Sequence, residues 1–487
     1  MTDTKVAARP SPKVSDEVRK TTCYMCACRC GINVHMQDGK VKYIEGNRDH
    51  PVNQGVLCAK GSAGIMQHYA PSRLRKPLKR TGPRGSGEFQ EISWDEAYDI
   101  AVSWLKPIRE TDPSKLAFFT GRDQSQSFTS FWAQAFGTPN YAAHGGFCSV
   151  NMAAAGIYTM GGAFWEFGQP DWDRTRLFVL FGVAEDHDSN PIKIGIGKVK
   201  KNGGRIIGVN PIRSGYNAVA DDWIGITPGT DGLLILSVIH ELLKAGKVDL
   251  NYLSRYTNSG FLVNDNPEDA DYGLFLRDEA GKALVLDRAT GKPAAYDAPG
   301  VKPDLAGHLR KGGITYKPAF QLLAEKYLDP KYAPEAVAAE CGLTPKRIKA
   351  LAAELAQVAF EQEITLDVEW TDWKGEKHSK MTGRPVSFHS MRGISAHSNG
   401  FQTARALHIL QILLGSVEVP GGFRFKPPYP KPRGAPKPMP ASGGQAARRA
   451  ASMGYPMGPE HLLINEDGRP SVSTRLYLGE PVRQRMA

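Results

Sequence analysis

The spacing of the cysteines constrains this chain more than any other feature of its sequence. Five of the seven cysteines fall within the first 58 residues, and four of those lie in the stretch TTCYMCACRC, at positions 23, 26, 28 and 30. The fifth is Cys58 in GVLCAKG, so the sequence lacks the second close pair of Cys or His that a structural zinc site usually has. An odd number of clustered cysteines also argues against a disulfide framework. The pattern indicates bound metal.

Four of these cysteines, Cys23, Cys26, Cys30 and Cys58, form the pattern C-x2-C-x3-C-x27-C. Three close ligands on one loop and a remote fourth suit a cubane [4Fe–4S] cluster, which needs one thiolate at each iron. Cys28 alternates with Cys26 and Cys30, so a loop that directs those two at the cluster turns Cys28 away. The sequence therefore predicts four cluster ligands and one bystander.

Length and composition indicate an enzyme-sized α/β protein with several domains. The chain has 487 residues, of which 41% are hydrophobic. Its longest apolar run, LLILSVIHELL from Leu233, is much shorter than the roughly 20 residues that span a membrane. The N-terminus has neither the apolar core of a secretory signal nor paired arginines, so we expect a cytoplasmic protein. Residues 1–20 are expected to be disordered.

A net charge of +11 could indicate a protein that binds nucleic acid, but the distribution of the charge argues against this function. From Arg424 to Arg449 there are seven basic residues, no acidic residue and several prolines. This composition is typical of an extended linker or a partner-docking arm, and no aromatic and basic binding module accompanies it. We predict an extended tail over 424–487 and no nucleic-acid partner; a nucleic-acid binder that uses this tail is the alternative.

Beyond the cysteines, strands and helices alternate as in doubly wound α/β folds. A helix is predicted to begin after Ser93, because Ser93 and Glu96 have the spacing of a capping box. The turn-rich stretch 264–304 is expected to be a surface hairpin. Further strands are expected at 115–121, 176–182, 205–210, 364–370 and 385–393, and further helices at 191–201, 318–328, 345–357, 403–414 and after 228–231.

Three blocks of the sequence resemble one known family. The cysteine pattern with GVLCAKG, the block RLRKPLKRTGPRGSGEFQEISWDEA and the block PGTDGLLIL are similar to signatures of the molybdenum or tungsten bis-pterin oxidoreductases of the dimethyl sulfoxide reductase superfamily. The resemblance extends to about Phe423. It implies a [4Fe–4S] cluster and a molybdenum (or tungsten) bis-molybdopterin guanine dinucleotide as cofactors.

The resemblance also implies the domain organisation, an N-terminal [4Fe–4S] domain followed by two doubly wound, Rossmann-like cofactor-binding domains. We expect the cluster domain over 21–65 and one α/β pterin-binding domain over 66–143 plus 361–423. The other is expected over 144–360, with the hairpin near 264–304 as an insert. Members of the family typically end in a β-barrel domain that covers the pterins, and we expect this cap domain to be absent from this chain.

Cys148, in AAHGGFCSVNMAAAG, lies where the family places its molybdenum ligand, and a soft thiolate suits a redox metal. An apolar filler is the alternative, and that interpretation suits Cys341 in AAECGL. His144 is a further, catalytic candidate close to Cys148. The resemblance also implies that Lys60, two residues after Cys58, lies on the electron path between cluster and pterin, whereas an ordinary surface lysine is the alternative.

A cofactor with nucleotide diphosphates needs anion-binding loops at strand ends and helix starts. Three segments qualify, Gly182–Pro191, Asn210–Gly215 and Pro228–Asp231, and Met391–Gly400 is expected at the second pterin. For any one residue in them, a turn or a helix cap is nearly as good an interpretation.

Within these loops, Asp231 is predicted to contact the guanine edge. Arg392 and His397 are predicted on the substrate side, where they bind an oxyanion or relay a proton. The remaining predicted cofactor-binding residues are Gly182, Asn190, Asn210, Arg213, Gly229, Thr230, Gly393 and Asn399.

The resemblance implies the catalytic subunit of an enzyme that performs two-electron chemistry on a small oxyanion at molybdenum. Electrons then leave through the pterin, Lys60 and the cluster to an iron–sulfur partner subunit. Formate dehydrogenases of the family usually have histidine after the metal ligand, where this chain has Ser149. The blocks GFCSVNMAAAG and MRGISAHSNG are most similar to the sulfur-oxyanion branch, especially cytoplasmic sulfite dehydrogenase catalytic subunits. Those subunits also work with a membrane anchor subunit, so we expect sulfite oxidation at the inner face of a membrane.

Three alternatives stay open. The first two are a formate dehydrogenase and a thiosulfate or polysulfide reductase-type catalytic subunit. The third is non-enzymatic, an electron-transfer subunit or inactive fragment of this fold, against which Cys148 and the phosphate-loop residues argue.

Overall fold

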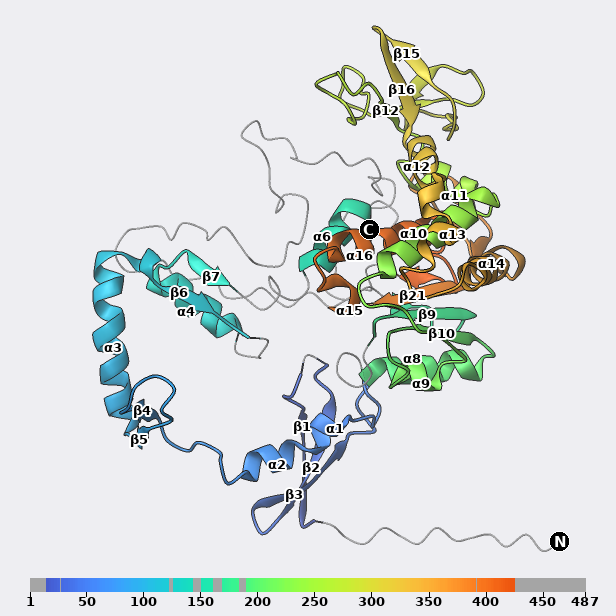
Figure 1. The fold of residues 1–487 in the computed structure, drawn as a ribbon. Helices are drawn as coiled ribbons and strands as arrows, with labels where there is room; N and C mark the ends of the chain where they lie inside the picture. Colours follow the sequence, from blue (N-terminus) through green and yellow to red (C-terminus); the bar gives the residue numbers. More distant parts are fainter. Residues whose placement is uncertain are drawn as a thin grey trace, which may run out of the picture. The chain divides into compact units, whose positions relative to one another are not determined.

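The computed structural model describes residues 15–26, 28–121, 126–142, 150–160, 169–183, 190–390 and 392–424. By internal packing the chain divides into two units, one made mainly of residues up to His144 and the other mainly of residues from Gly145 to Gly434. Figure 1 labels the elements of each unit.

The N-terminal unit begins with an antiparallel sheet in the order β1-β2-β3. Residues 17–20 correct the prediction of a disordered segment over 1–20, because they belong to β1 and pair with β2. All six residues of β1 are exposed, so the strand has no apolar alternation that the sequence could reveal. The elements of this part are β1 (Glu17–Thr22), β2 (Gly31–Gln37), β3 (Lys40–Gly46), α1 (Ala59–Ser62) and α2 (Gly64–Tyr69).

A second part of this unit contains the predicted capped helix, α3. Ser93 is its N-cap, and the Ser93 hydroxyl accepts a hydrogen bond from the main-chain N–H of Glu96 at 3.1 Å, which confirms that prediction. β6 and β7 are parallel with α4 between them, and β6 confirms the strand predicted at 115–121. The elements are β4 (Leu78–Arg80), β5 (Phe89–Glu91), α3 (Trp94–Thr111), η1 (Pro113–Lys115), β6 (Ala117–Phe119), α4 (Gln126–Phe136) and β7 (Asn140–Ala142).

The C-terminal unit is built on a parallel sheet in the order β11-β10-β9-β21. All five residues of β9 and of β21 are buried, as expected for strands covered on both faces. β21 lies in the segment 361–423 and β9 in the segment 144–360, so this sheet takes strands from both sides of the predicted domain boundary. The strands are β9 (Leu177–Phe181), β10 (Arg205–Val209), β11 (Asp222–Ile224) and β21 (Val386–Ser390).

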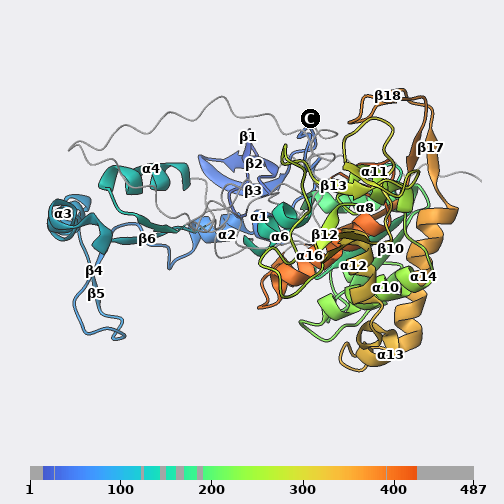
Figure 2. The same cartoon turned by 90° about the horizontal axis from the view of Figure 1, so that it is seen from above.

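Helices cover both faces of this sheet. Figure 1 shows α8 and α9 on one face and α10 and α14 on the other. α10 packs side by side with α14 (Figure 2) and also contacts α16, which in turn packs on α6. In α16, 11 of the 14 residues are buried, so the helix runs through the core. These helices are α6 (Val150–Met160), α8 (Asn190–Lys201), α9 (Tyr216–Val219), α10 (Asp231–Lys244), α14 (Pro345–Glu361) and α16 (Gly400–Leu413).

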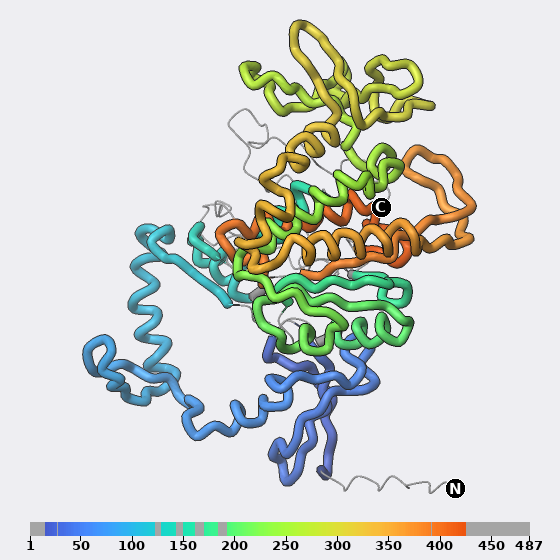
Figure 3. Tube along the Cα trace, turned by 45° about the vertical axis from the view of Figure 1, so that its right-hand side comes forward, coloured from blue at the N-terminus to red at the C-terminus, as the bar shows by residue number. Residues whose placement is uncertain are grey.

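An insert extends this unit at one end, seen in yellow in Figure 3. It contains a sheet in the order β12-β16-β15 and the antiparallel hairpin β13-β14, which lies within the turn-rich stretch 264–304. Its strands are β12 (Leu262–Asn264), β13 (Leu284–Leu286), β14 (Pro293–Ala295), β15 (Leu309–Lys311) and β16 (Ile314–Pro318). The neighbouring helices are α11 (Leu250–Tyr256), α12 (Ala319–Tyr327), η2 (Pro330–Tyr332) and α13 (Pro334–Val337).

The strand predicted at 364–370 is in fact two short strands. β17 pairs with β20 and β18 pairs with β19, because the chain turns between Leu366 and Val368, where the two residues share a main-chain hydrogen bond of 3.0 Å. The remaining elements are β8 (Gln169–Pro170), β17 (Ile364–Leu366), β18 (Trp370–Thr371), β19 (Lys377–His378), β20 (Met381–Gly383), α15 (Arg392–Ser395) and β22 (Phe423–Arg424). Within the described ranges, no helix has the length and apolar character needed to cross a membrane.

Candidate functional site

The loop from Cys23 to Cys30 joins β1 to β2. Its two ends are tied by a hydrogen bond of 2.7 Å from the main-chain N–H of Cys23 to the carbonyl oxygen of Cys30. Cys58 is the N-cap residue of α1. Cys23, Cys30 and Cys58 are only 7%, 3% and 6% exposed. Three of the four predicted cluster ligands therefore lie inside the domain rather than at its surface.

The degree of burial does not show which of Cys26 and Cys28 is the cluster ligand, because both are half-buried. The two residues are linked by the main-chain N–H of Cys28, which donates to Cys26 Sγ at 3.5 Å. A donated hydrogen bond stabilises a thiolate and is one of the factors that set the potential of an iron–sulfur cluster. The contact favours Cys26 as the charged ligand, and the bystander role of Cys28 stays a prediction.

The surroundings of these thiols suit an iron–sulfur cluster. Thiolates are the ligands that such clusters use, and an apolar shell limits the access of solvent to them. Cys23 and Cys30 pack with Ile32 in one small core. The side chains packed against that core are those of Cys28, Val34, Ile44 and Leu57.

Lys60 lies in α1, two residues after Cys58, and is half-buried. A Cβ atom on Gly61 would lie 2.4 Å from Leu57 Cδ1, so this turn packs closely on the segment that leads to Cys58. The backbone that carries Lys60 is therefore fixed relative to Cys58. Its place on an electron path stays a prediction.

The second group of predicted residues lies at one edge of the C-terminal sheet. Gly182 follows β9, Asn210 follows β10 and residues 392–399 follow β21, while residues 227–231 come shortly after β11. Because parallel strands end at the same edge, these segments gather there, and this is the edge at which α/β folds bind ligands.

Two of the glycines at this edge touch each other through their backbones. Gly182 has a φ of +59°, and a Cβ atom built on it would lie 3.1 Å from the carbonyl carbon of Gly393. A Cβ atom on Gly393 would lie only 1.9 Å from the carbonyl oxygen of Gly182. The close approach of the two loops therefore requires glycine at position 393.

The loop Thr227–Asp231 is supported from within the protein. The Thr230 hydroxyl donates to the carbonyl oxygen of Thr227 at 2.7 Å, and the Thr227 N–H donates to the carbonyl oxygen of Cys341 at 3.0 Å. Cys341 is fully buried, and its thiol donates to the Thr230 carbonyl oxygen at 3.8 Å. Cys341 thus holds this loop in addition to filling space.

His397 and Asn399 connect the loops. The Asn399 side-chain amide donates to the carbonyl oxygen of Gly229 at 3.0 Å, which ties residues 392–399 to residues 227–231. His397 Nε2 is 3.0 Å from the carbonyl oxygen of Gly393. Because a carbonyl only accepts, Nε2 is the protonated nitrogen in this contact. Both side chains are exposed at the edge.

Asp231 is the first residue of α10 and is 6% exposed. Burial raises the pKa of its carboxyl, while a hydrogen bond from its own backbone and the charge of His397 act in the opposite direction. The N-terminus of α10 and the neighbouring glycine loops fit a ligand with phosphate groups, because helix N-termini and closely approaching backbones bind anions.

The other predicted residues at this edge are less informative. The Asn210 side-chain oxygen accepts from the N–H of Ile212 at 3.2 Å, which is the turn-forming role that was the alternative for this residue. Arg213 and Arg392 are exposed. Cys148 and His144 lie outside the described residues, and so does the side chain of Asn190, at which α8 begins.

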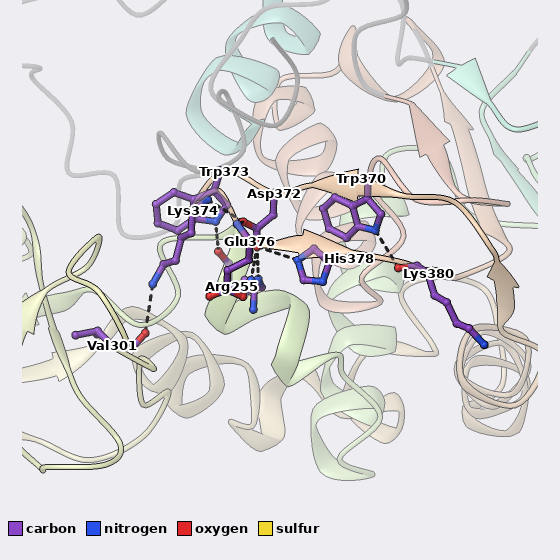
Figure 4. A network of polar contacts seen from close by, with 9 residues as sticks. All are labelled: Arg255, Val301, Trp370, Asp372, Trp373, Lys374, Glu376, His378 and Lys380. Atoms are coloured by element: carbon purple, nitrogen blue, oxygen red, sulfur yellow. Dashed lines mark hydrogen bonds and ion pairs between the residues drawn. The ribbon is translucent and has the colours of Figure 1, made fainter.

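One cluster of ligand-type side chains was not predicted. Asp372, Glu376 and His378 have ligand atoms within 4.8 Å of one another, as Figure 4 shows. Arg255 forms ion pairs with both carboxylates, and Arg255 Nε donates to Asp372 Oδ2 at 2.8 Å. Burial alone would raise the pKa of Asp372, but bonds from Arg255, the Glu376 backbone and His378 lower it. Because one guanidinium pairs with both carboxylates and leaves a single net negative charge, we interpret the cluster as a structural ion-pair network.

No sequence spacing could have revealed this network, because Arg255 lies in α11 and its partners lie in the turn between β18 and β19. Trp373 Nε1 also donates to the carbonyl oxygen of Arg255 at 2.8 Å, so the network fastens that turn to α11.

The chain is similar to known proteins along most of its length. Residues 16–70 match the family model described as "Molybdopterin oxidoreductase Fe4S4 domain", and residues 73–454 match the one described as "Molybdopterin oxidoreductase". One subunit of the sulfite dehydrogenase of Allochromatium vinosum is 50% identical over 93% of this chain and 48% of its own length. The chain therefore spans about half the length of that relative.

Two further relatives are more distant. Thiosulfate reductase molybdopterin-containing subunit PhsA of Salmonella typhimurium is 32% identical over 49% of this chain and 31% of its own length. The structure of acetylene hydratase from Pelobacter acetylenicus superposes with a TM-score of 0.55 at 18% identity, over 82% of this chain and 43% of that one. This likeness shows a shared fold. By its matched domains the chain belongs to the molybdopterin oxidoreductase family, whose cofactors here are a [4Fe–4S] cluster and a molybdenum molybdopterin.

Proposed function

We propose that this chain is the catalytic part of an oxidoreductase that oxidises sulfite. The observation that carries the proposal is the 50% identity to one subunit of a sulfite dehydrogenase over 93% of this chain. Oxidation of sulfite to sulfate takes one oxygen from water and releases two electrons and two protons, so the protein needs a two-electron site and a one-electron exit.

We assign the one-electron exit to the cysteine domain. Cys23, Cys26, Cys30 and Cys58 would hold the cluster, and three of them are buried in the domain. Lys60 would contribute positive charge on the electron path to it. Cys148 would bind molybdenum as a thiolate. When bound, the cofactors supply two-electron redox chemistry at the metal and single-electron transfer at the cluster.

The loops at the carboxyl edge of the sheet would bind the guanine dinucleotide parts of two pterins. Gly182, Gly229 and Gly393 would let the backbone approach phosphate closely, and Thr230 would keep the loop before α10 in shape through its bond to Thr227. The carboxylate of Asp231 would accept hydrogen bonds from guanine. The further contacts proposed for the cofactor are those of Asn190, Asn210, Arg213 and Asn399.

Exposed polar side chains at the same edge would act on the substrate. Arg392 has the fork of donors that suits an oxyanion, and His397 could hold or release a proton at Nδ1 while Nε2 bonds to Gly393. His144 is a third candidate.

We further propose that an iron–sulfur partner subunit accepts the electrons and that an anchor subunit places the enzyme at the cytoplasmic face of a membrane. The relative with 50% identity is named as one subunit of its enzyme, which supports a multi-subunit assembly. Thiosulfate reduction is the second candidate, since the relative with 32% identity is named for it.

The proposal is tested by purifying the protein without oxygen, together with its partner subunits, and measuring metal content and turnover. Molybdenum, iron and sulfite oxidation are expected together. Correctly folded protein that lacks molybdenum would contradict the enzyme proposal. Turnover of formate or thiosulfate without sulfite oxidation would contradict only the proposed substrate, not the proposal that the protein is an oxidoreductase.

A further inference from the structure

The cluster site is assembled from two segments that are far apart in the sequence. Cys23, Cys26 and Cys30 lie on the loop before β2, whereas Cys58 follows β3 and a further irregular segment. A cluster bound by all four thiolates needs both segments at one place. A contact within the protein that joins the two segments lowers the cost of bringing them together when the metal binds.

Asn53 is the side chain that bridges the two segments. It is 0% exposed, although asparagine is usually a surface residue. Its Oδ1 accepts from the main-chain N–H of Gly31 at 2.8 Å, and its Nδ2 donates to the Gly31 carbonyl oxygen at 3.1 Å. The same Nδ2 donates to the carbonyl oxygen of Val56 at 2.9 Å. Gly31 directly follows Cys30.

These three hydrogen bonds use both amide hydrogens and the amide oxygen of Asn53. The side chain pairs with both backbone groups of Gly31, as a neighbouring strand would, and it reaches the segment two residues before Cys58. The orientation of the amide is fixed by this arrangement, because Oδ1 faces a donor and Nδ2 faces two acceptors. A carboxylate of the same shape would place an oxygen against two carbonyls.

The packing around this contact is tight. A Cβ atom on Gly31 would lie 2.4 Å from His50 Cγ, and a Cβ atom on Gly46 would lie 2.1 Å from the Gly55 carbonyl oxygen. The segment that carries Asn53 therefore rests directly on the ends of β2 and β3. The Asn53 amide therefore makes its hydrogen bonds where two glycines, Gly31 and Gly46, leave no space for a larger side chain.

We infer that Asn53 is a positioning residue that joins the Cys30 loop to the Cys58 segment and so pre-forms the cluster site. The inference rests on the cluster ligands proposed above. Loss of side chains that orient metal ligands typically weakens metal binding by roughly 10- to 100-fold. The variant Asn53→Asp keeps the shape and removes both donors, while Asn53→Ala removes all three bonds without adding a buried charge.

The test uses the full-length chain, reconstituted without oxygen with ferrous iron and sulfide. Bound iron and sulfide, the electron paramagnetic resonance spectrum of the reduced cluster and the rate of iron loss to a chelator are measured. Gln54→Glu is the matched control, because it makes the same amide-to-acid change at the next residue, which is exposed. We expect both Asn53 variants to lose iron about tenfold faster or more, with an altered spectrum, and the control to behave as wild type.

Hydrogen exchange separates positioning from general folding. In the Asn53 variants the amide of Gly31 is expected to lose protection, while the amides that pair β1 with β2 keep it. Retention of iron at the control rate by both variants would overturn the inference. Loss of β1–β2 protection in both would also overturn it, because Asn53 would then support the whole domain. Wild-type iron retention in Cys58→Ala would instead refute the ligand assignment.

Discussion

Gly393 lies so close to Gly182 that a Cβ atom on Gly393 would sit 1.9 Å from the Gly182 carbonyl oxygen. The contact joins the segments that follow two neighbouring parallel strands, β9 and β21. This contact lies at the edge of the sheet where we place the cofactor loops. Substitutions at this edge therefore test two things, the close packing of the loops and the contacts proposed for the cofactor.

Replacing Gly393 with alanine is expected to destabilise the protein by about 2–3 kcal/mol, because backbone atoms must move to admit the methyl group. Equilibrium unfolding in urea measures the change. Gly197→Ala is the control: this glycine lies in α8 with open space around its Cβ position, and alanine there should be neutral or stabilising by up to about 1 kcal/mol. Equal stability of both variants would mean that the two loops separate easily.

Replacing Asp231 with asparagine is expected to have opposite effects on stability and on cofactor retention. Burial raises the pKa of this carboxyl above its ordinary 3.8, so the folded state holds the proton more tightly than the unfolded state does. Its ionised form therefore costs stability as the pH rises through and above 3.8. The cofactor-free variant should be at least as stable as wild type near about pH 7 and show no advantage well below pH 3.8.

The same Asp231→Asn variant should retain less guanine dinucleotide than wild type, which is measured by releasing and quantifying the nucleotide from purified protein. Asp278 in the insert is the control position, since its side chain caps a surface turn by accepting from the N–H of Lys282. Unchanged nucleotide content in the Asp231 variant would remove Asp231 from the proposed site.

Replacing Arg255 with methionine is expected to cost roughly 2–4 kcal/mol near neutral pH, because it leaves the Asp372 carboxylate, whose side chain is 0% exposed, without its cation. The pKa of Asp372 is lowered below its ordinary 3.8 in the folded protein, so this contribution is present above that pH and is lost as the pH falls further. Urea unfolding at several pH values measures both effects.

A surface pair provides the control for that experiment. Lys380 and Asp367 are 67% and 85% exposed and 3.6 Å apart, so Lys380→Met should change stability by less than about 0.5 kcal/mol. Zinc ions should not raise the unfolding temperature of the wild-type protein through Asp372, Glu376 and His378. Zinc-dependent stabilisation that disappears in His378→Ala would show that the network is a metal site after all.

Replacing Cys28 with alanine should spare the cluster, whereas the same change at Cys58 should damage it. Cluster absorbance and bound iron in the two variants are the measurements. Both variants make the same cysteine-to-alanine change, so a difference between them reflects the position of the thiol and not the loss of a sulfur atom as such. Equal loss of iron in the two variants would place Cys28 among the ligands.

Much of the local structure was predictable because its signals are local. The Ser93 cap, the strands β6, β9 and β10 and the cysteine spacing each depend on residues within one short segment, although β6 is largely exposed where its apolar sequence suggested a buried strand. The pairing of β21 with β9 was not predictable, since a fully buried strand has no alternation that specifies its neighbour. The fully exposed β1 carried no apolar signal either.

The interactions that position the candidate site were the least predictable. Asn53 stands in the sequence HPVNQG, where asparagine looks like an ordinary turn residue, and only the fold reveals its bonds to Gly31 and Val56. The bond from Asn399 to Gly229 likewise joins segments far apart in sequence. Such contacts depend on which loops lie next to each other in the folded protein, and the spacing of residues along the chain does not specify this.

Reduction of the cluster by sulfite tests the central proposal most directly. Protein purified without oxygen and shown to contain molybdenum and iron is mixed with sulfite, and the reduced cluster is detected by electron paramagnetic resonance. We predict a signal that grows with sulfite in the wild-type protein, is absent in Cys58→Ala and does not grow with sulfite in Cys148→Ala. A fully loaded wild-type protein whose cluster stays oxidised in excess sulfite, yet is reduced by dithionite, would contradict the proposed function.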